Sequence, residues 1–160
     1  MTFTPHTPDP DLDLELEREV EVPPERVWAA WTTPELLTQW FAPQPYMTPH
    51  CEIDLRPGGA FRTVMRSPDG DEMESAGCYL EVIPNERLVW TSALAPGYRP
   101  QTGELLFTAV IELRSTSSGG TRYRAIAMHQ NTDDAKRHAD MGFAEGWGAA
   151  LDQLVALMKR

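Results

Sequence analysis

The sequence predicts a two-layer α+β domain, in which one amphipathic helix covers the apolar face of an antiparallel sheet. Three observations support this fold class. Charged and apolar residues alternate over residues 11–22, and clusters of Gly, Pro, Asn and Asp separate further strand-like segments up to residue 129. An apolar stripe at helical spacing then runs through residues 143–158. The apolar face of such a sheet must be buried, and we expect the last helix to pack against it.

Length and composition fit a single domain. The chain has 160 residues and a mass of 18.0 kDa, with 41% hydrophobic and 24% charged residues, which is the balance of a globular protein. Residues 1–10 contain three prolines and no periodic pattern, so we expect a disordered tail there. We expect residues 11–160 to form the domain.

Charge narrows the classes of partner. The chain has 14 basic and 24 acidic residues, which gives a net charge of −10. A net negative charge disfavours binding to the phosphate backbone of a nucleic acid. We therefore expect no nucleic-acid partner. No apolar run approaches the roughly 18 residues of a membrane span, and the first residues lack the pattern of a signal peptide. We expect no membrane span and a cytoplasmic location.

The first strand, at about residues 11–22, carries carboxylates on one face and apolar residues on the other, and Arg18 alone interrupts the apolar row. Pro23 and Pro24 end it. Two short helices are predicted next, one at about residues 25–33 and one beginning at Pro34. Because the carboxylates occupy one face, we expect Arg122 and Arg124 of the last strand to lie opposite them.

Six further strands are predicted after a Pro-rich break at residues 42–49. Their approximate ranges are 50–56, 60–66, 72–83, 86–93, 105–114 and 121–129. A longer loop, residues 95–103, precedes the fifth of these. The final helix is predicted at residues 133–158, with Thr132 or Asp133 as its N-cap, and at 1.5 Å per residue it would be about 39 Å long.

Several short sequence motifs occur in an order that resembles that of the helix-grip superfamily of START-like domains, also called SRPBCC. They are VWxxWTxPxxLxxWF at 27–41, DLRPGG at 54–59, GxxLEV at 77–82, ERLVWT at 86–91 and GFxxGWxxxLDxL at 142–154. The sequence is most similar to the family of activators of heat-shock-protein-90 ATPase. This resemblance implies a seven-stranded curved antiparallel sheet wrapped round the long C-terminal helix, two short helices between strands 1 and 2, and a cavity.

Strand parity separates side chains that face the helix from those that face solvent. The inward rows are apolar with a few polar points, which is the composition of a pocket for a small hydrophobic molecule. The candidates for cavity contact are Arg18, Trp40, Cys51, Phe61, Met65, Trp90, Phe107, Tyr123, His129, Met141 and Trp147. The same parity turns Cys51 and Cys78 inward on strands roughly 9.6 Å apart, so we expect free thiols and no disulfide.

Several candidates have two interpretations. Arg18 either pairs with a ligand carboxylate or has a partner within the protein. Gly142, Gly146 and Gly148 either leave room for a ligand or allow close packing against tryptophan.

The two histidines beside the predicted start of the last helix, His129 and His138, are also ambiguous. They either act at the cavity mouth as acid and base or bind a metal, or they are satisfied within the protein or solvated. The chain has no HExxH or CxxC spacing, so we expect no metal and no tightly bound cofactor.

These observations favour a START-like domain that binds a small hydrophobic molecule, as a monomer or a homodimer. The alternative from the enzyme class is a cofactor-free cyclase or hydrolase in which Arg18, Tyr123 or His129 polarises a substrate. No GxSxG, P-loop or dinucleotide fingerprint is present and no catalytic set is identified, which favours binding over catalysis. A third possibility, suggested by the family name, is a module that contacts a chaperone.

Overall fold

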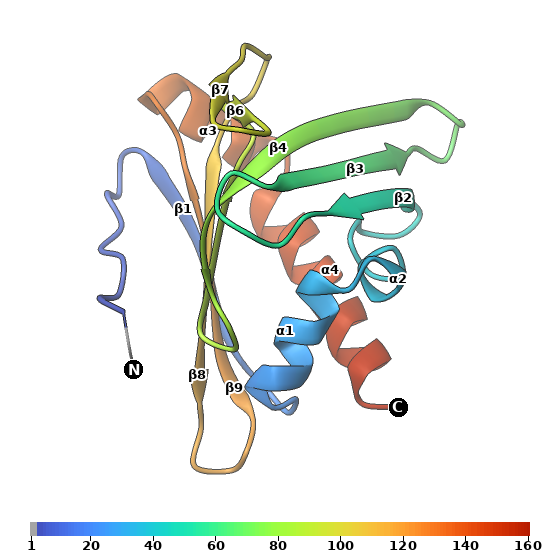
Figure 1. Ribbon diagram of the computed structural model, residues 1–160, viewed down its shortest axis with the longest axis vertical. Coiled ribbons are helices and arrows are strands. Elements are labelled where there is room, and N and C mark those ends of the chain that lie inside the picture. The colour runs from blue at the N-terminus through green and yellow to red at the C-terminus, as the bar shows by residue number, and fades with distance from the viewer. Residues whose placement is uncertain (1–2) are drawn as a thin grey trace.

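The computed structural model describes residues 3–160, and a single curved sheet dominates it (Figure 1). Seven strands form this sheet in the order β1-β9-β8-β5-β4-β3-β2, and each neighbouring pair is antiparallel. A separate two-stranded ribbon joins β6 to β7. The strands are β1 (Asp13–Val20), β2 (Met47–Ile53), β3 (Ala60–Arg66), β4 (Glu72–Ile83), β5 (Arg87–Thr91), β6 (Leu94–Ala95), β7 (Arg99–Pro100), β8 (Thr108–Ser115) and β9 (Thr121–Met128).

The helices lie on the concave side of the sheet (Figure 1). They are α1 (Pro24–Thr32), α2 (Pro34–Leu37), α3 (Thr132–Asp140) and α4 (Phe143–Met158). The sheet curls so that β2, β3 and the far end of β4 reach over α4, while α1 and α2 lie beside it. The predicted α+β helix-grip fold is therefore confirmed, including the two short helices between the first two strands of the sheet.

The alternating first strand pairs as its pattern predicts. β1 lies against β9, with Glu17 opposite Arg124 and Glu19 opposite Arg122. Arg124 Nε lies 2.5 Å from Glu15 Oε2, and Arg122 forms ion pairs with Glu17 and Glu19. The predicted pairing of the acidic row with these two arginines is confirmed, and it offsets part of the repulsion between neighbouring carboxylates.

The long C-terminal helix is broken, which corrects the prediction of one helix over residues 133–158. Gly142 adopts φ +94° between α3 and α4, a conformation that L side chains rarely adopt. The cap also differs from the prediction. Asn131, and neither Thr132 nor Asp133, accepts a hydrogen bond from the Asp134 backbone N–H at 2.8 Å. The break lets α3 turn across the end of the sheet.

A register shift in β4 corrects the parity predicted for that strand. Tyr79 pairs with Trp90 but Glu81 pairs with Val89, so one extra residue is inserted between them. Tyr79 therefore packs in the main core, whereas Leu80 packs on the opposite face. Cys78, predicted to point inward, sits opposite Thr91 on the outer side; it is a free thiol, as is Cys51.

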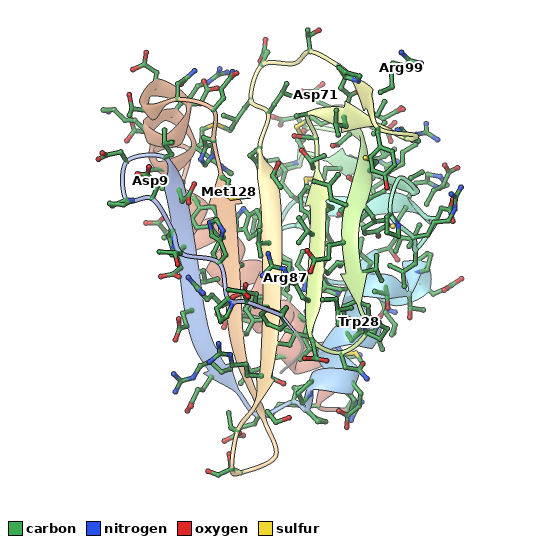
Figure 2. The ribbon with its side chains drawn as sticks, turned by 60° about the vertical axis from the view of Figure 1, so that its left-hand side comes forward. Asp9, Trp28, Asp71, Arg87, Arg99 and Met128 are labelled. Atoms are coloured by element: carbon green, nitrogen blue, oxygen red, sulfur yellow. The ribbon has the colours of Figure 1, made fainter. Side chains whose placement is uncertain are left out.

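The N-terminal segment lies along the outer, convex face of the sheet (Figure 2). The His6 backbone N–H donates to Glu112 Oε2 at 2.9 Å, and Arg124 Nη2 donates to the His6 carbonyl at 2.7 Å. Arg87 Nη1 donates to the Thr4 carbonyl. The predicted tail is thus hydrogen-bonded to the sheet from residue 4 onward, because buried charges on this face need partners. Met1 and Thr2, also assigned to that tail, lie outside the described residues.

Candidate functional site

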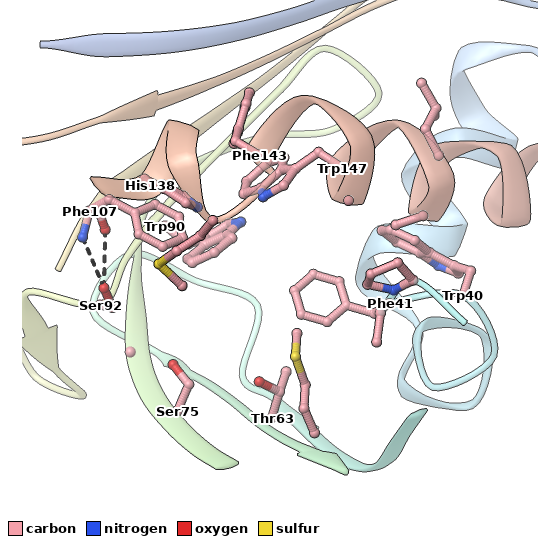
Figure 3. A pocket seen from close by; sticks show the side chains of 18 of the residues that line it. Trp40, Phe41, Thr63, Ser75, Trp90, Ser92, Phe107, His138, Phe143 and Trp147 are labelled. Atoms are coloured by element: carbon pink, nitrogen blue, oxygen red, sulfur yellow. Dashed lines mark hydrogen bonds between the residues drawn. The ribbon is translucent and has the colours of Figure 1, made fainter. Parts of the chain in front are cut away.

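A pocket of about 380 Å³ lies between the concave face of the sheet, the α1–α2 elbow and the helix pair α3–α4 (Figure 3). Among the described residues that line it, none carries a charge at neutral pH. The lining consists of Trp31, Trp40, Phe41, Ala42, Pro43, Phe61, Thr63, Met65, Ser75, Gly77, Trp90, Ser92, Leu105, Phe107, Tyr123, His138, Met141, Gly142, Phe143, Gly146, Trp147, Ala150 and Leu151. Such a mostly apolar wall with a few polar groups is typical of a small-molecule site.

The elbow end of the pocket is built from rings whose polar atoms are already bonded. Trp40 Nε1 donates to the Ala30 carbonyl at 3.0 Å, and Trp31 Nε1 donates to the Tyr123 hydroxyl at 3.2 Å. The Trp31 and Trp40 rings meet edge to face with centroids 4.9 Å apart. Burial raises the pKa of Tyr123, so its hydroxyl stays protonated. This end offers a rigid aromatic surface with its donors in use.

The opposite end contains a pair of histidines. His129 Nδ1 lies 2.8 Å from the Leu12 carbonyl, and His129 Nε2 lies 2.9 Å from His138 Nδ1. A carbonyl only accepts, so Nδ1 of His129 carries the proton. When Nδ1 carries the one proton of the His129 ring, Nε2 of His129 accepts and Nδ1 of His138 donates in this contact. The remaining nitrogen of His138, Nε2, is therefore an acceptor at the pocket wall.

His138 remains uncharged over a wide pH range. Burial, reinforced by the neighbouring His129, lowers the pKa of His138 from 6.5 to about 4. Its ring packs against Phe107 at 4.8 Å and Phe143 at 5.3 Å between centroids. A neutral imidazole held in one tautomer among aromatic rings serves as a fixed hydrogen-bond acceptor.

Trp90 supplies a donor on the other side of Phe107. The two rings lie 5.6 Å apart between centroids, and Figure 3 shows Trp90, Phe107 and His138 grouped at one end of the pocket. Trp90 is 6% exposed, yet its Nε1 has no hydrogen-bond partner among residues 3–160. Tyr79 Oη is similarly unpartnered, but Tyr79 does not line the pocket. A buried indole N–H without a partner is unusual in a folded protein.

The nearby serine does not supply the missing acceptor. Ser92 Oγ donates to the Phe107 carbonyl at 3.3 Å and accepts from the Phe107 backbone N–H at 3.1 Å. These two bonds use the hydroxyl proton and one of its two lone pairs (Figure 3), and Ser92 Oγ makes no hydrogen bond to Trp90. Beside Phe107, the N–H groups of Trp90 and Trp147 and Nε2 of His138 make no hydrogen bond to the described residues, and of these only Trp90 Nε1 is fully buried.

The glycines near the last helix have different roles: some leave room in the pocket, and another allows close packing. Gly142 and Gly146 line the pocket, and a Cβ on Gly146 would meet only Pro43 Cγ, at 3.8 Å. A Cβ on Gly148, by contrast, would lie 2.8 Å from Arg18 Nη2. Gly146 therefore leaves open volume, whereas Gly148 allows close approach of another side chain.

The structure brings most of the candidate cavity residues into one wall. Trp40, Phe61, Met65, Trp90, Phe107, Tyr123, Met141 and Trp147 line the pocket. Sequence parity missed Phe41 and His138 as lining residues, because Phe41 lies in the segment after α2 and His138 lies on α3, and strand parity applies to neither.

Three candidates lie elsewhere. Arg18 reaches past Gly148 and pairs with Asp152 at 3.2 Å, so its partner is internal. Cys51 is buried in the core beside the pocket, and burial raises the pKa of its thiol to about 11, which opposes a nucleophilic role. His129 is shielded from the pocket by His138. The residues proposed for an enzyme, Arg18, Tyr123 and His129, are therefore not gathered around one point.

Two further absences apply to the part of the chain that the structure describes. Between residues 3 and 160, no three His, Cys, Asp or Glu side chains come together as a metal-ligand set. Over the same residues, every helix is too short or too polar to cross a lipid bilayer.

Comparisons with known proteins agree with this architecture. The family model of Activator of Hsp90 ATPase homolog 1-like proteins matches residues 21–159. A crystal structure of a protein from Nitrosomonas europaea is 52% identical, covers 94% of this chain and 96% of its own, and superposes with a TM-score of 0.91. No curated protein matches the sequence.

More distant structures share the fold. A Mycobacterium smegmatis protein is 25% identical, with a TM-score of 0.77 and coverage of 92% of this chain and 90% of its own. An AHSA1-like protein from Aeromonas hydrophila is 21% identical, with a TM-score of 0.68 and coverage of 92% of each chain. At the latter identity the likeness concerns the fold alone.

Proposed function

The chain belongs to the family of Activator of Hsp90 ATPase homolog 1-like proteins, and from this START-like architecture we propose that it binds a small, uncharged, hydrophobic molecule in the pocket beneath α4. One observation carries the proposal. The pocket of about 380 Å³ is walled by aromatic and aliphatic side chains, and no lining residue supplies a charge to hold an ionised ligand. The volume is within the range of about 300–1,000 Å³ common for ligand sites.

The absence of a lining charge determines the class of ligand. Burying an ionised group without a partner is very costly, so a carboxylate or sulfonate has no compensating contact here. An uncharged aromatic or alicyclic molecule instead gains from removal of its surface from water, at about 25 cal/mol per Å². Edge-to-face contact with rings such as Phe61 and Trp90 adds to this.

A matched pair of fluorescent probes tests the proposal. N-phenyl-1-naphthylamine is uncharged, and 1-anilinonaphthalene-8-sulfonate adds a sulfonate to the same rings. We expect the neutral probe to bind with enhanced fluorescence and the sulfonate to bind at least tenfold more weakly. Gly146→Leu, which places a side chain in the open volume, is expected to abolish binding of the neutral probe, whereas Glu17→Gln on the outer face leaves it unchanged.

The proposal is wrong if the neutral probe does not bind, or if it binds Gly146→Leu as well as the wild type. A cytoplasmic location, a monomeric or dimeric state and contact with a chaperone stay predictions. Stimulation of a chaperone ATPase rate by the purified protein is the measurement that tests the last of these.

A further inference from the structure

We propose that His138 and Trp90 together select the ligand, and that they favour an uncharged aromatic molecule carrying a hydroxyl group. This inference rests on the proposed function and adds the polar contacts that fix the ligand's orientation. It comes from two unused hydrogen-bonding atoms, one a donor and one an acceptor, on two pocket residues whose rings both contact Phe107.

The acceptor is fixed by a chain of bonds that begins at the first strand. The Leu12 carbonyl accepts from both the backbone N–H and the Nδ1–H of His129, at 3.1 and 2.8 Å. This assigns the tautomer of His129, which in turn requires Nδ1 of His138 to be the donor in the 2.9 Å contact. His138 Nε2 makes no hydrogen bond to any of the described residues. It therefore presents a lone pair to a donor on the ligand.

The donor is the indole N–H of Trp90. A buried polar group left unpaired destabilises the folded protein, and native proteins retain few of them. The other two indoles that the elbow contributes, Trp31 and Trp40, both have acceptors within the protein. The indole N–H of Trp147 also has no acceptor among the described residues, but Trp90 is the indole of this pocket whose unpartnered N–H is buried, and a ligand oxygen is the acceptor that we infer for it.

A hydroxyl group matches this pair because it both donates and accepts. A methyl ether accepts from Trp90 but offers nothing to His138, and a plain hydrocarbon offers nothing to either. A carboxylate also accepts but cannot donate to His138 once ionised, and no lining cation neutralises it. The geometry therefore favours a phenol or naphthol over its ether, its parent hydrocarbon and its acid analogue.

The test compares 2-naphthol with 2-methoxynaphthalene by isothermal titration calorimetry on the full chain. The two probes share their rings and differ in the ability to donate. We expect 2-naphthol to bind at least tenfold more tightly, the ratio that one hydrogen bond of about 1.4 kcal/mol produces. In His138→Phe, which keeps a ring but has no acceptor, the ratio is expected to fall to about one.

Two further variants guard against a folding artefact. Trp90→Phe removes the donor together with part of the ring surface and is expected to weaken both probes to a similar extent, because each has an oxygen that accepts and each packs on the same ring. Met65→Leu, on β3 in the same pocket, removes no hydrogen-bonding group and is expected to leave the ratio unchanged. Circular dichroism and thermal unfolding establish that each variant is folded.

The outcomes separate the two proposals. Equal affinity of both probes for the wild type would overturn the inference about His138 and leave the proposed function standing. A preference for 2-naphthol that persists in a folded His138→Phe variant also overturns it. Failure of both probes, together with failure of N-phenyl-1-naphthylamine, contradicts the proposed function as well.

Discussion

The two faces of the sheet differ in whether their buried polar atoms have hydrogen-bond partners, although the same strands form both faces. On the outer face the Glu112 carboxylate, only 4% exposed, lies 2.5 Å from Arg87 Nη1 and 3.0 Å from Arg124 Nη1. It also accepts from the His6 backbone N–H. On the inner face Trp90 Nε1 and His138 Nε2 have no such partners among the described residues. Unpartnered buried atoms also occur outside the pocket, at Tyr79 Oη and at Arg87 Nε, which lies 3.3 Å from Glu81 Oε1. Trp90 Nε1 differs from these two because its residue lines the pocket, which is why we propose a second molecule as its partner.

The outer face depends on its charge balance, and the largest expected effect follows from this. Glu112→Gln removes the buried negative charge that Arg87 and Arg124 share, leaving Arg87 with Glu81 and Arg124 with Glu15, two more exposed carboxylates. We expect the free energy of unfolding to fall by about 3–5 kcal/mol. Urea denaturation followed by tryptophan fluorescence measures the change.

Glu17→Gln is the matched control. Its carboxylate is 45% exposed and 3.7 Å from Arg122, so its removal is expected to change stability by less than about 0.5 kcal/mol. Equal effects of the two substitutions would contradict the contrast between a buried network and a solvated row of charges.

The inner face predicts a pH dependence of stability. The pKa of His138 is about 4 in the folded protein and 6.5 when exposed to water. As pH falls from 6.5 towards 4, the unfolded chain binds a proton that the folded chain does not, so stability is lost in that window. We expect the wild type to lose about 1 kcal/mol more than His138→Gln between pH 7 and pH 5, after allowance for water reaching the ring.

Parallel loss of stability in wild type and His138→Gln would show that other groups carry the acid sensitivity. Urea unfolding at several pH values distinguishes the two results. The comparison is internal, because the carboxylates on the outer face are the same in both proteins.

Gly146 links stability to pocket volume. Gly146→Ala adds a Cβ that meets only Pro43 Cγ, at 3.8 Å, and replaces glycine in a helix interior. We expect a gain of about 0.5–1 kcal/mol in stability and a several-fold weaker affinity for the neutral probe. Gly148→Ala should gain less, because its Cβ would displace Arg18. A gain in stability without loss of affinity contradicts the placement of the ligand beside Gly146.

The smallest effect is expected at Arg18. Its partner Asp152 is 74% exposed and their atoms lie 3.2 Å apart, so the ion pair is well solvated. Asp152→Asn is expected to change the free energy of unfolding by no more than about 0.5 kcal/mol and to leave probe affinity unaltered. A large loss of affinity would mean that Arg18 contacts the ligand after all.

The sequence pattern predicted most strands of the sheet, because the alternation of polar and apolar residues and the turn residues between strands are local signals. The pairing of β1 with β9 follows from Glu17 and Glu19 facing Arg124 and Arg122. The bulge at Tyr79 was not predicted, since one inserted residue leaves the local composition unchanged while reversing the parity of Cys78. The apolar stripe begins at Phe143, so it does not reveal whether the polar residues 133–141 belong to the same helix, and the break at Gly142 was not predicted.

The site was predictable as an apolar wall but not as a set of hydrogen-bonding atoms. Strand parity identified Trp90 and Phe107 as inward residues. It does not reveal that Trp31 finds Tyr123 as an acceptor while Trp90 finds none, because those partners come from distant segments. The tautomer of His138 depends likewise on the Leu12 carbonyl, which lies 117 residues from His129.

The most direct test of an inner face left incomplete for a ligand is the NMR signal of the Trp90 indole N–H during titration with 2-naphthol. We predict that this signal moves to lower field and shifts more than those of Trp31 and Trp40, whose N–H groups already donate within the protein. A Trp90 signal that stays in place at saturating 2-naphthol would contradict the account.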